Sequence, residues 1–214
     1  MPAALEVRAG GRSIGGRIGY REKGMLSTGS GRGTNDRPLG EVFEPGAFDF
    51  SIRQAVDMST SHDIHLLAAH DTRAPLASVK AGSLKFKDGK RQMDFEADLV
   101  NTRAADDVLE LIAKRVAVGV SFGFMLPPER RSPNAIEMKR EPFELGEGED
   151  AVRFDPEPDV PGADVRVIRD VLLFEVSVGV TRPVYKANTA RLRAEGYLWD
   201  VPAPKKSRRS IWLP

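Results

Sequence analysis

The short run Gly119-Val-Ser-Phe-Gly-Phe124 places the strongest constraint on how this chain folds. In a β-strand, alternate side chains point to opposite faces. One face would carry Val118, Val120, Phe122 and Phe124, and the other would carry Gly119, Ser121 and Gly123. The pattern predicts a strand over residues 116–124 with one apolar face. Its other face holds a single hydroxyl between two residues without side chains.

The two glycines beside Ser121 have two interpretations. Glycine within a strand often marks a close approach by a ligand or another backbone, so an extended substrate would lie against Ser121 Oγ. The alternative is a buried serine beside a β-bulge. The strand-turn-helix elbow of many G-x-S-x-G motifs does not fit, because Phe122 and Phe124 continue the strand. A catalytic role for Ser121 therefore needs a base elsewhere in the chain.

Length and composition narrow the class of protein. A chain of 214 residues suits one domain with a proper core. Its 32 Lys and Arg residues nearly balance its 31 Asp and Glu residues, so a general affinity for nucleic acid is not expected. The absence of cysteine excludes disulfides, thiolate catalysis and cysteine metal sites, and it fits a reducing compartment.

No membrane segment is expected. Residues 1–8 lack the apolar region of a secretory signal. The most apolar stretch, residues 171–180, is interrupted by Glu175 and is too short to span a bilayer. The sequence therefore predicts a protein made in the cytoplasm.

Apolar periodicity predicts an α+β chain, with a mainly antiparallel sheet or barrel and helices packed on it. The predicted elements are a strand pair within 5–20, a helix over 47–57, a strand over 64–70, a hairpin of 84–86 and 93–99, a helix capped by Asn101 or Thr102, the serine strand, a strand within 165–180, and a helix over 187–196. In the strand within 165–180, we expect Phe174, Val176, Val178 and Val180 to share the apolar face.

We expect residues 1–201 to form a single domain. Residues 24–40, rich in Gly, Ser, Thr and Arg, are predicted to be a mobile loop. Residues 127–163 are rich in proline and acids, which indicates a surface excursion with a short strand near 135–138. Whether this excursion gates a substrate or has no function is left open. Residues 202–214 are predicted to be a basic tail.

Three residues have the chemistry of acyl transfer: His70, Ser121 and Glu175. His70 ends an apolar run, and Glu175 interrupts another, where a carboxylate is costly unless it is hydrogen-bonded or paired. A neutral imidazole can take the proton of a serine hydroxyl. A carboxylate on the other ring nitrogen then fixes the tautomer and stabilises the imidazolium. The residue types therefore predict a Ser121–His70–Glu175 triad that needs no cofactor.

A metal site is the competing interpretation of the histidines. Its candidate ligands are His62, Asp63, His65, His70 and Asp71. On an extended strand, His65 and His70 point to opposite faces, which argues against all three histidines binding one ion. We therefore expect no metal.

Four motifs occur together and in order: Phe43-Glu-Pro-Gly-Ala-Phe48, Leu66-Leu-Ala-Ala-His-Asp71, the serine run, and Leu172-Leu-Phe-Glu-Val-Ser-Val178. With them, the chain resembles the prohead (capsid maturation) serine proteases of tailed bacteriophages and prophages over roughly residues 14–190. Two features depart from the family pattern. The excursion over 127–163 replaces a short hairpin, and Thr181-Arg-Pro-Val184 stands where Phe-Pro-Ala is usual.

The resemblance implies a fold similar to herpesvirus assemblin, a β-barrel ringed by helices. It implies a serine endopeptidase, made in the host cytoplasm and enclosed in the immature capsid, that cleaves the scaffold or the scaffolding segment of the major capsid protein. The motif matches give Ser121 as nucleophile, His70 as base and Glu175 as third member. Assemblin-type sites use a second histidine in the third role, which leaves His62 and His65 as alternatives.

Two other functions remain as alternatives. One is a catalytically silent scaffold component that occupies the prohead, and the other is a metal-dependent hydrolase that uses His and Asp. The sequence leaves open the cleavage preference, self-cleavage, the oxyanion-hole donors and whether the chain forms oligomers.

Overall fold

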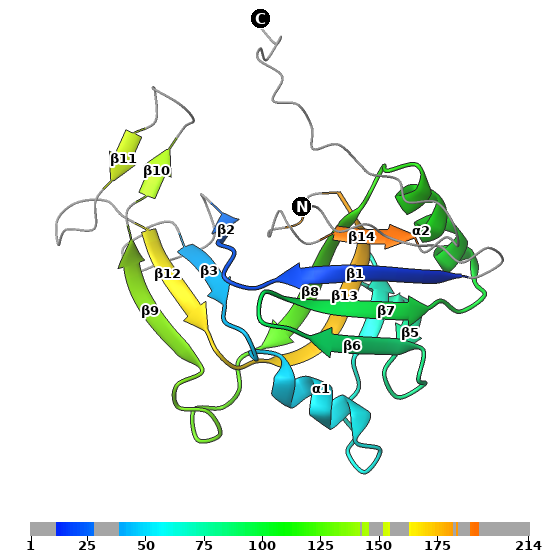
Figure 1. Cartoon of the computed structure of the whole chain (residues 1–214), viewed down its shortest axis with the longest axis horizontal. Coiled ribbons are helices and arrows are strands. Elements are labelled where there is room, and N and C mark those ends of the chain that lie inside the picture. The colour runs from blue at the N-terminus through cyan, green and yellow to red at the C-terminus, as the bar shows by residue number, and fades with distance from the viewer. Residues whose placement is uncertain are drawn as a thin grey trace, which may run out of the picture.

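The structure, a computed structural model, describes residues 12–27, 39–141, 143–145, 152–154, 163–181, 183 and 189–192. These residues form two helices and three sheets, arranged as in Figure 1. The elements are β1 (Ser13–Gly19), β2 (Gly24–Ser27), β3 (Leu39–Phe43), α1 (Asp49–Val56), β4 (His65–Ala68), β5 (Asp71–Ser78), β6 (Leu84–Asp88), β7 (Gln92–Asp98), α2 (Arg103–Ala113), β8 (Gly119–Met125), β9 (Ile136–Glu141), β10 (Phe143–Leu145), β11 (Val152–Phe154), β12 (Ala163–Ile168), β13 (Leu172–Val180) and β14 (Thr189–Leu192). Neither helix is long and apolar enough to cross a membrane.

The largest sheet has eight strands in the order β5-β4-β13-β8-β14-β1-β7-β6. Within it, β13 lies between β4, to which it is parallel, and β8, to which it is antiparallel. A second sheet has the order β2-β3-β12-β9 and lies beside the large sheet, and β10 pairs with β11 (Figure 1). Strand β13, which carries Glu175, therefore lies between β8, which carries Ser121, and β4, which ends two residues before His70.

Aromatic side chains join the two larger sheets. Phe43, at the end of β3, packs edge-on against Phe122 and Phe124 of β8, with ring centroids 5.1 and 5.2 Å apart. Phe48, which precedes α1, stacks on Phe43 at 5.4 Å. Each buried aromatic side chain contributes about 1.5–3 kcal/mol by leaving water. This cluster fixes the apolar face of β8 toward the core, as its alternating sequence predicts, and leaves Ser121 on the opposite face.

The helices form where the sequence predicts them. Thr102 caps α2, and its side chain accepts a hydrogen bond from Ala105 N. The buried stripe of α2 is Ala105, Val108 and Ile112. In α1, Ser51 Oγ donates to the carbonyl of Val171 (2.7 Å) and accepts from the amide of Leu173 (2.8 Å). Helix α1 is therefore hydrogen-bonded to the backbone at the beginning of β13 through this one side chain.

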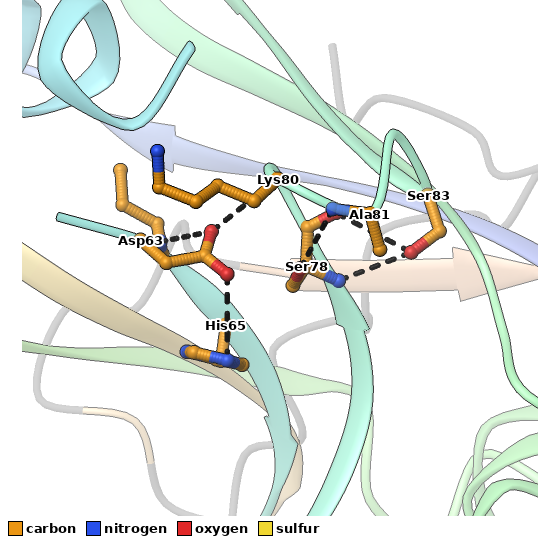
Figure 2. Close-up of polar contacts among 7 residues, drawn as sticks. Asp63, His65, Ser78, Lys80, Ala81 and Ser83 are labelled. Atoms are coloured by element: carbon orange, nitrogen blue, oxygen red, sulfur yellow. Dashed lines mark hydrogen bonds and ion pairs between the residues drawn. The ribbon is translucent and has the colours of Figure 1, made fainter. Parts of the chain in front are cut away.

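The predicted closed barrel is wrong, although the α+β class is confirmed. The outer strands β5 and β6 share no ladder in the described part of the chain. They meet at one end, where Ser83 N donates to the Ser78 carbonyl (3.2 Å) and Ser78 N to Ser83 Oγ (3.1 Å) (Figure 2). Strand β5 carries Pro75, which has no N–H, and its register against β4 shifts twice. Such a strand suits the edge of a sheet. The likeness to assemblin stays a prediction.

The helix predicted over 187–196 is also wrong at its centre, because Thr189–Leu192 forms β14. This strand pairs antiparallel with β1 from Arg17 to Ile14, and Thr189 pairs with Gly119 of β8. Pairing with two distant strands overrides the local preference for helix.

Parts of the predicted loops are strands as well. The stretch 24–40 begins with β2 and ends in β3, and residues 28–38 lie outside the described residues. The excursion 127–163 contains β9, which pairs antiparallel with β12 at the edge of the four-stranded sheet. It also contains β10 and β11. The predicted basic tail, residues 202–214, lies outside the described residues.

Strand β13 departs from regular alternation at Phe174. Its register against β8 shifts between Leu173 and Glu175, as in a β-bulge. Leu173 is therefore fully buried, whereas Phe174 is 42% exposed instead of lying on the core face. After the bulge, Val176 and Val178 are buried as predicted, with Glu175 on the other face.

Candidate active site

His70 lies in a two-residue turn between β4 and β5, which pair through Ala68 and Asp71. Both turn residues have positive φ, 46° for Ala69 and 64° for His70. This region is unfavourable for residues with a Cβ, at about 1–3 kcal/mol each. Two hydrogen bonds to β13 offset that cost. Ala69 N donates to Val178 O (2.9 Å), and His70 N donates to Ser177 Oγ (3.0 Å). The turn therefore holds the imidazole next to β13.

The structure brings His70 and Glu175 together. His70 Nδ1 lies 2.7 Å from Glu175 Oε1 across 105 positions in the sequence. The Glu175 side chain is 8% exposed, whereas the His70 side chain is 45% exposed. An Nδ1 that donates to a carboxylate leaves Nε2 as the proton acceptor. The ring can therefore act as a base through its free nitrogen.

Ser121 lies on the same face of the sheet as this pair. In the β8–β13 register, Ser121 is opposite Ser177, and Gly123 is opposite Glu175. Residues directly opposite each other share a face, and diagonal neighbours lie about 7–8 Å apart. Among the described residues, Ser121 Oγ makes no hydrogen bond to His70. Such catalytic contacts are often long without substrate and tighten in its complex.

The glycines beside Ser121 leave room for other parts of the protein. A Cβ on Gly123 would lie 2.5 Å from Glu175 Oε1 and 2.6 Å from the ring of Phe174. A Cβ on Gly119 would lie 2.4 Å from the carbonyl oxygen of Val180. A side chain at position 123 would therefore overlap the carboxylate oxygen that contacts His70, a consequence that the spacing of the motif alone does not reveal.

The two other histidines, His62 and His65, make no hydrogen bond to Glu175 in the part of the chain that the structure describes. His65 Nε2 lies 3.5 Å from Asp63 Oδ2, and Asp63 Oδ1 accepts from the amide of Lys80 at 3.0 Å (Figure 2). His62 Nε2 is buried without a hydrogen-bond partner in the described part of the chain. Within that part, no group of three His, Asp or Glu side chains is arranged to hold a metal ion.

Asp71 follows His70 in the sequence but is paired elsewhere. Its Oδ1 accepts from Arg73 Nε at 3.0 Å and from the amide of Arg73 at 2.9 Å. These hydrogen bonds hold the pKa of the Asp71 carboxyl below its usual value. Glu175 is therefore the carboxylate that contacts the imidazole.

Sequence reasoning did not assign a role to Ser177. This side chain is fully buried, and its Oγ donates to Glu175 Oε2 at 2.6 Å. The signal for it was present, since Ser177 follows Glu175 by two residues and must share its face of a regular strand.

A model of the family described as caudovirus prohead serine protease matches residues 30–197. No curated protein and no solved structure matches the chain. The family match covers most of the 214 residues and includes the β4–β5 turn, the serine strand and β13. The chain therefore belongs to the caudovirus prohead serine protease family.

Proposed function

We propose that this serine-type prohead peptidase works through an acyl-enzyme formed on Ser121, with His70 as general base and Glu175 as the group that orients His70. One observation carries the proposal, namely the 2.7 Å contact between His70 Nδ1 and Glu175 Oε1 on the face of the sheet that bears Ser121. The contact supports the roles because it occupies the ring nitrogen that does not face the nucleophile in a serine triad.

In the first half of the reaction, Ser121 Oγ attacks the scissile carbonyl carbon while His70 Nε2 takes the hydroxyl proton. The imidazolium then gives this proton to the leaving amine as the C–N bond breaks. In the second half, water attacks the acyl ester by the same route, and Ser121 is released. Backbone amides near the serine strand would stabilise the oxyanion.

We further propose that the substrate is the scaffold, or the scaffolding segment of the major capsid protein, within the immature capsid. The family match supports a capsid-related substrate. Under this proposal, the chain is made in the host cytoplasm and enters the prohead with its substrate. Self-cleavage is an additional reaction of the same site, to be tested on the same samples.

The test is to mix the purified protein with the major capsid protein and scaffold of the same phage, and to follow intact masses. We expect new fragments with the wild-type chain and with Ser61→Ala, a change at an exposed serine before β4. We expect none with Ser121→Ala, which should fold because it removes one hydroxyl from a half-buried strand position.

Two further measurements separate the alternative functions. A fluorophosphonate should label Ser121 of the peptidase, and a catalytically silent scaffold component would not react. A chelator should leave cleavage unchanged, whereas a metal-dependent hydrolase would lose its activity. Cleavage at the wild-type rate by Ser121→Ala would overturn the proposal.

A further inference from the structure

Ser177 is a buried hydroxyl for which the proposed reaction has no role. Its side chain is 0% exposed and lies in β13, directly opposite Ser121 in the register with β8. Ser177 Oγ donates a hydrogen bond to Glu175 Oε2 at 2.6 Å and accepts one from the His70 amide at 3.0 Å. One hydroxyl therefore contacts both members of the His70–Glu175 pair.

These contacts close a ring. His70 Nδ1 meets one oxygen of Glu175, Ser177 binds the other oxygen, and the same hydroxyl returns to the His70 backbone. A carboxylate on a long side chain has a broad, nearly two-fold preference about its last torsion. A donor on Oε2 fixes this torsion and so directs Oε1 to the imidazole.

The backbone of His70 needs a similar restraint. Its positive φ of 64° is unfavourable for a residue with a Cβ, and the Ser177 hydroxyl accepts the amide hydrogen of this residue. If that acceptor is removed, the His70 amide and one oxygen of Glu175 both lose a partner. The turn and the carboxylate would then relax independently of each other.

We propose that Ser177 is a positioning residue, which holds the His70 turn and the Glu175 carboxylate in the arrangement that activates Ser121. The inference rests on the proposed function. It predicts that the loss of this hydroxyl slows acylation of Ser121 in molecules that remain folded.

Ser51 provides a matched control. It is also 0% exposed, and its hydroxyl also donates one hydrogen bond and accepts one. Its partners are backbone atoms of Val171 and Leu173, at the beginning of the same strand. Ser51→Ala therefore reports the structural cost of removing a buried hydroxyl next to β13, without a change at His70 or Glu175.

The experiment measures the rate at which a fluorophosphonate probe labels Ser121 in the wild type, Ser177→Ala and Ser51→Ala. Peptide mapping identifies the labelled serine, and the melting curve gives the folded fraction of each sample. We expect Ser177→Ala to be labelled more than about tenfold more slowly than Ser51→Ala, per folded molecule. Ser177→Ala should lower the maximal labelling rate and leave the probe concentration needed for half-saturation unchanged.

A purely structural role would lower the folded fraction and leave the rate per folded molecule unchanged. A rate for Ser177→Ala within about tenfold of that of Ser51→Ala therefore overturns the inference. If Ser177→Ala does not fold, the pair Ser177→Thr and Ser177→Val decides by the same threshold, because threonine has a hydroxyl where valine has a methyl group of similar size. If the wild type itself is not labelled on Ser121, the proposed function fails, and the inference fails with it.

Discussion

Gly123 and Glu175 face each other across the β8–β13 ladder, so that a Cβ on Gly123 would lie 2.5 Å from Glu175 Oε1. Real Cβ contacts are essentially never this short. The missing side chain at Gly123 is therefore part of what allows the carboxylate to reach His70 at 2.7 Å.

The first prediction is that Gly123→Ala displaces the Glu175 carboxylate. Overpacking of this kind costs about 1–3 kcal/mol of stability. Peptidase turnover per folded molecule should fall as well, because His70 loses its carboxylate. The control is Gly119→Ala, at the other glycine of β8. A Cβ there would lie 2.4 Å from the carbonyl oxygen of Val180, and Glu175 is not among its nearest neighbours. Equal turnover in the two folded variants would contradict this account.

The second prediction concerns Glu175→Gln, which keeps the size of the side chain. An amide favours the wrong imidazole tautomer, and a comparable change in a serine triad lowers turnover about ten-thousand-fold. Melting temperature and cleavage rate should be measured on one sample. A rate within about tenfold of the wild type, a deficit of no more than ~1.4 kcal/mol, would exclude Glu175 as the orienting group.

A matched control for that substitution is Glu41→Gln. Glu41 is also buried, and its Oε1 pairs with Arg166 Nη2 at 2.5 Å in the four-stranded sheet. Loss of this charge should lower stability while the cleavage rate per folded molecule stays unchanged, because Glu41 lies on β3 of the four-stranded sheet and not on the strands of the proposed site. The two variants together separate the cost of a buried charge from the cost to catalysis.

The third prediction tests the backbone strain in the His70 turn. Ala69 has φ +46°. Glycine at this position would avoid about 1–2 kcal/mol of steric cost in the folded state. It would also stabilise the unfolded state by about 0.5–1 kcal/mol, because an unfolded glycine has more conformational freedom than alanine. Ala69→Gly should therefore unfold at an equal or higher urea concentration than the wild type. The adjacent Ala68→Gly lies in β4 and has no such strain to relieve, so it should be less stable. A marked loss of stability in Ala69→Gly would refute the strain.

The fourth prediction is a pH dependence of stability at Asp88, which accepts a hydrogen bond from Tyr20 Oη at 2.5 Å. Burial, followed by the neighbouring Asp49 carboxyl, raises the pKa of Asp88 above its usual value, although the Tyr20 hydrogen bond opposes the shift. The folded state then keeps a proton that the unfolded state releases. The contribution of Asp88 to the free energy of unfolding therefore falls as the pH rises. The fall begins near the pKa of an unfolded aspartate, about 4, and ends above the raised pKa of the folded state.

The measurement is a series of melting temperatures between pH 3 and pH 7. Relative to the wild type, Asp88→Asn should gain stability as the pH rises through this window. Asp57→Asn should show the opposite trend, because hydrogen bonds from Ser59 lower the pKa of Asp57. Parallel curves for the wild type and Asp88→Asn would disprove the linkage.

Local patterns in the sequence predict the elements whose interactions are short-range. The alternation in β8 gives the correct core face for Phe122, and the cap at Thr102 marks the beginning of α2. Asp88-Gly89 ends β6 where the hairpin turns, and Gly89 N donates to Gln92 O at 3.0 Å. Each of these features is decided within a few residues.

The predictions fail where distant strands decide the structure. Strand β14 exists because β1 and β8 supply its partners, and the bulge that exposes Phe174 is a property of the β8–β13 pair. The site follows the same rule. The sequence supplied His70 and Glu175 as candidates, but the positive φ of the turn and the hydrogen bonds of Ser177 depend on three strands at once.

The position of β13 between β4 and β8 has a consequence for the order in which the chain is made. His70, in the turn after β4, and Ser121, on β8, leave the ribosome before residues 172–180, and β4 and β8 do not pair with each other within the described sheet. They are brought together only when β13 inserts between them and supplies Glu175 and Ser177. Contacts between residues this far apart in the sequence form slowly compared with local structure. Under the proposed roles, a nascent chain that ends before β13 carries His70 and Ser121 without Glu175, so the competence to cut proteins arises late in synthesis.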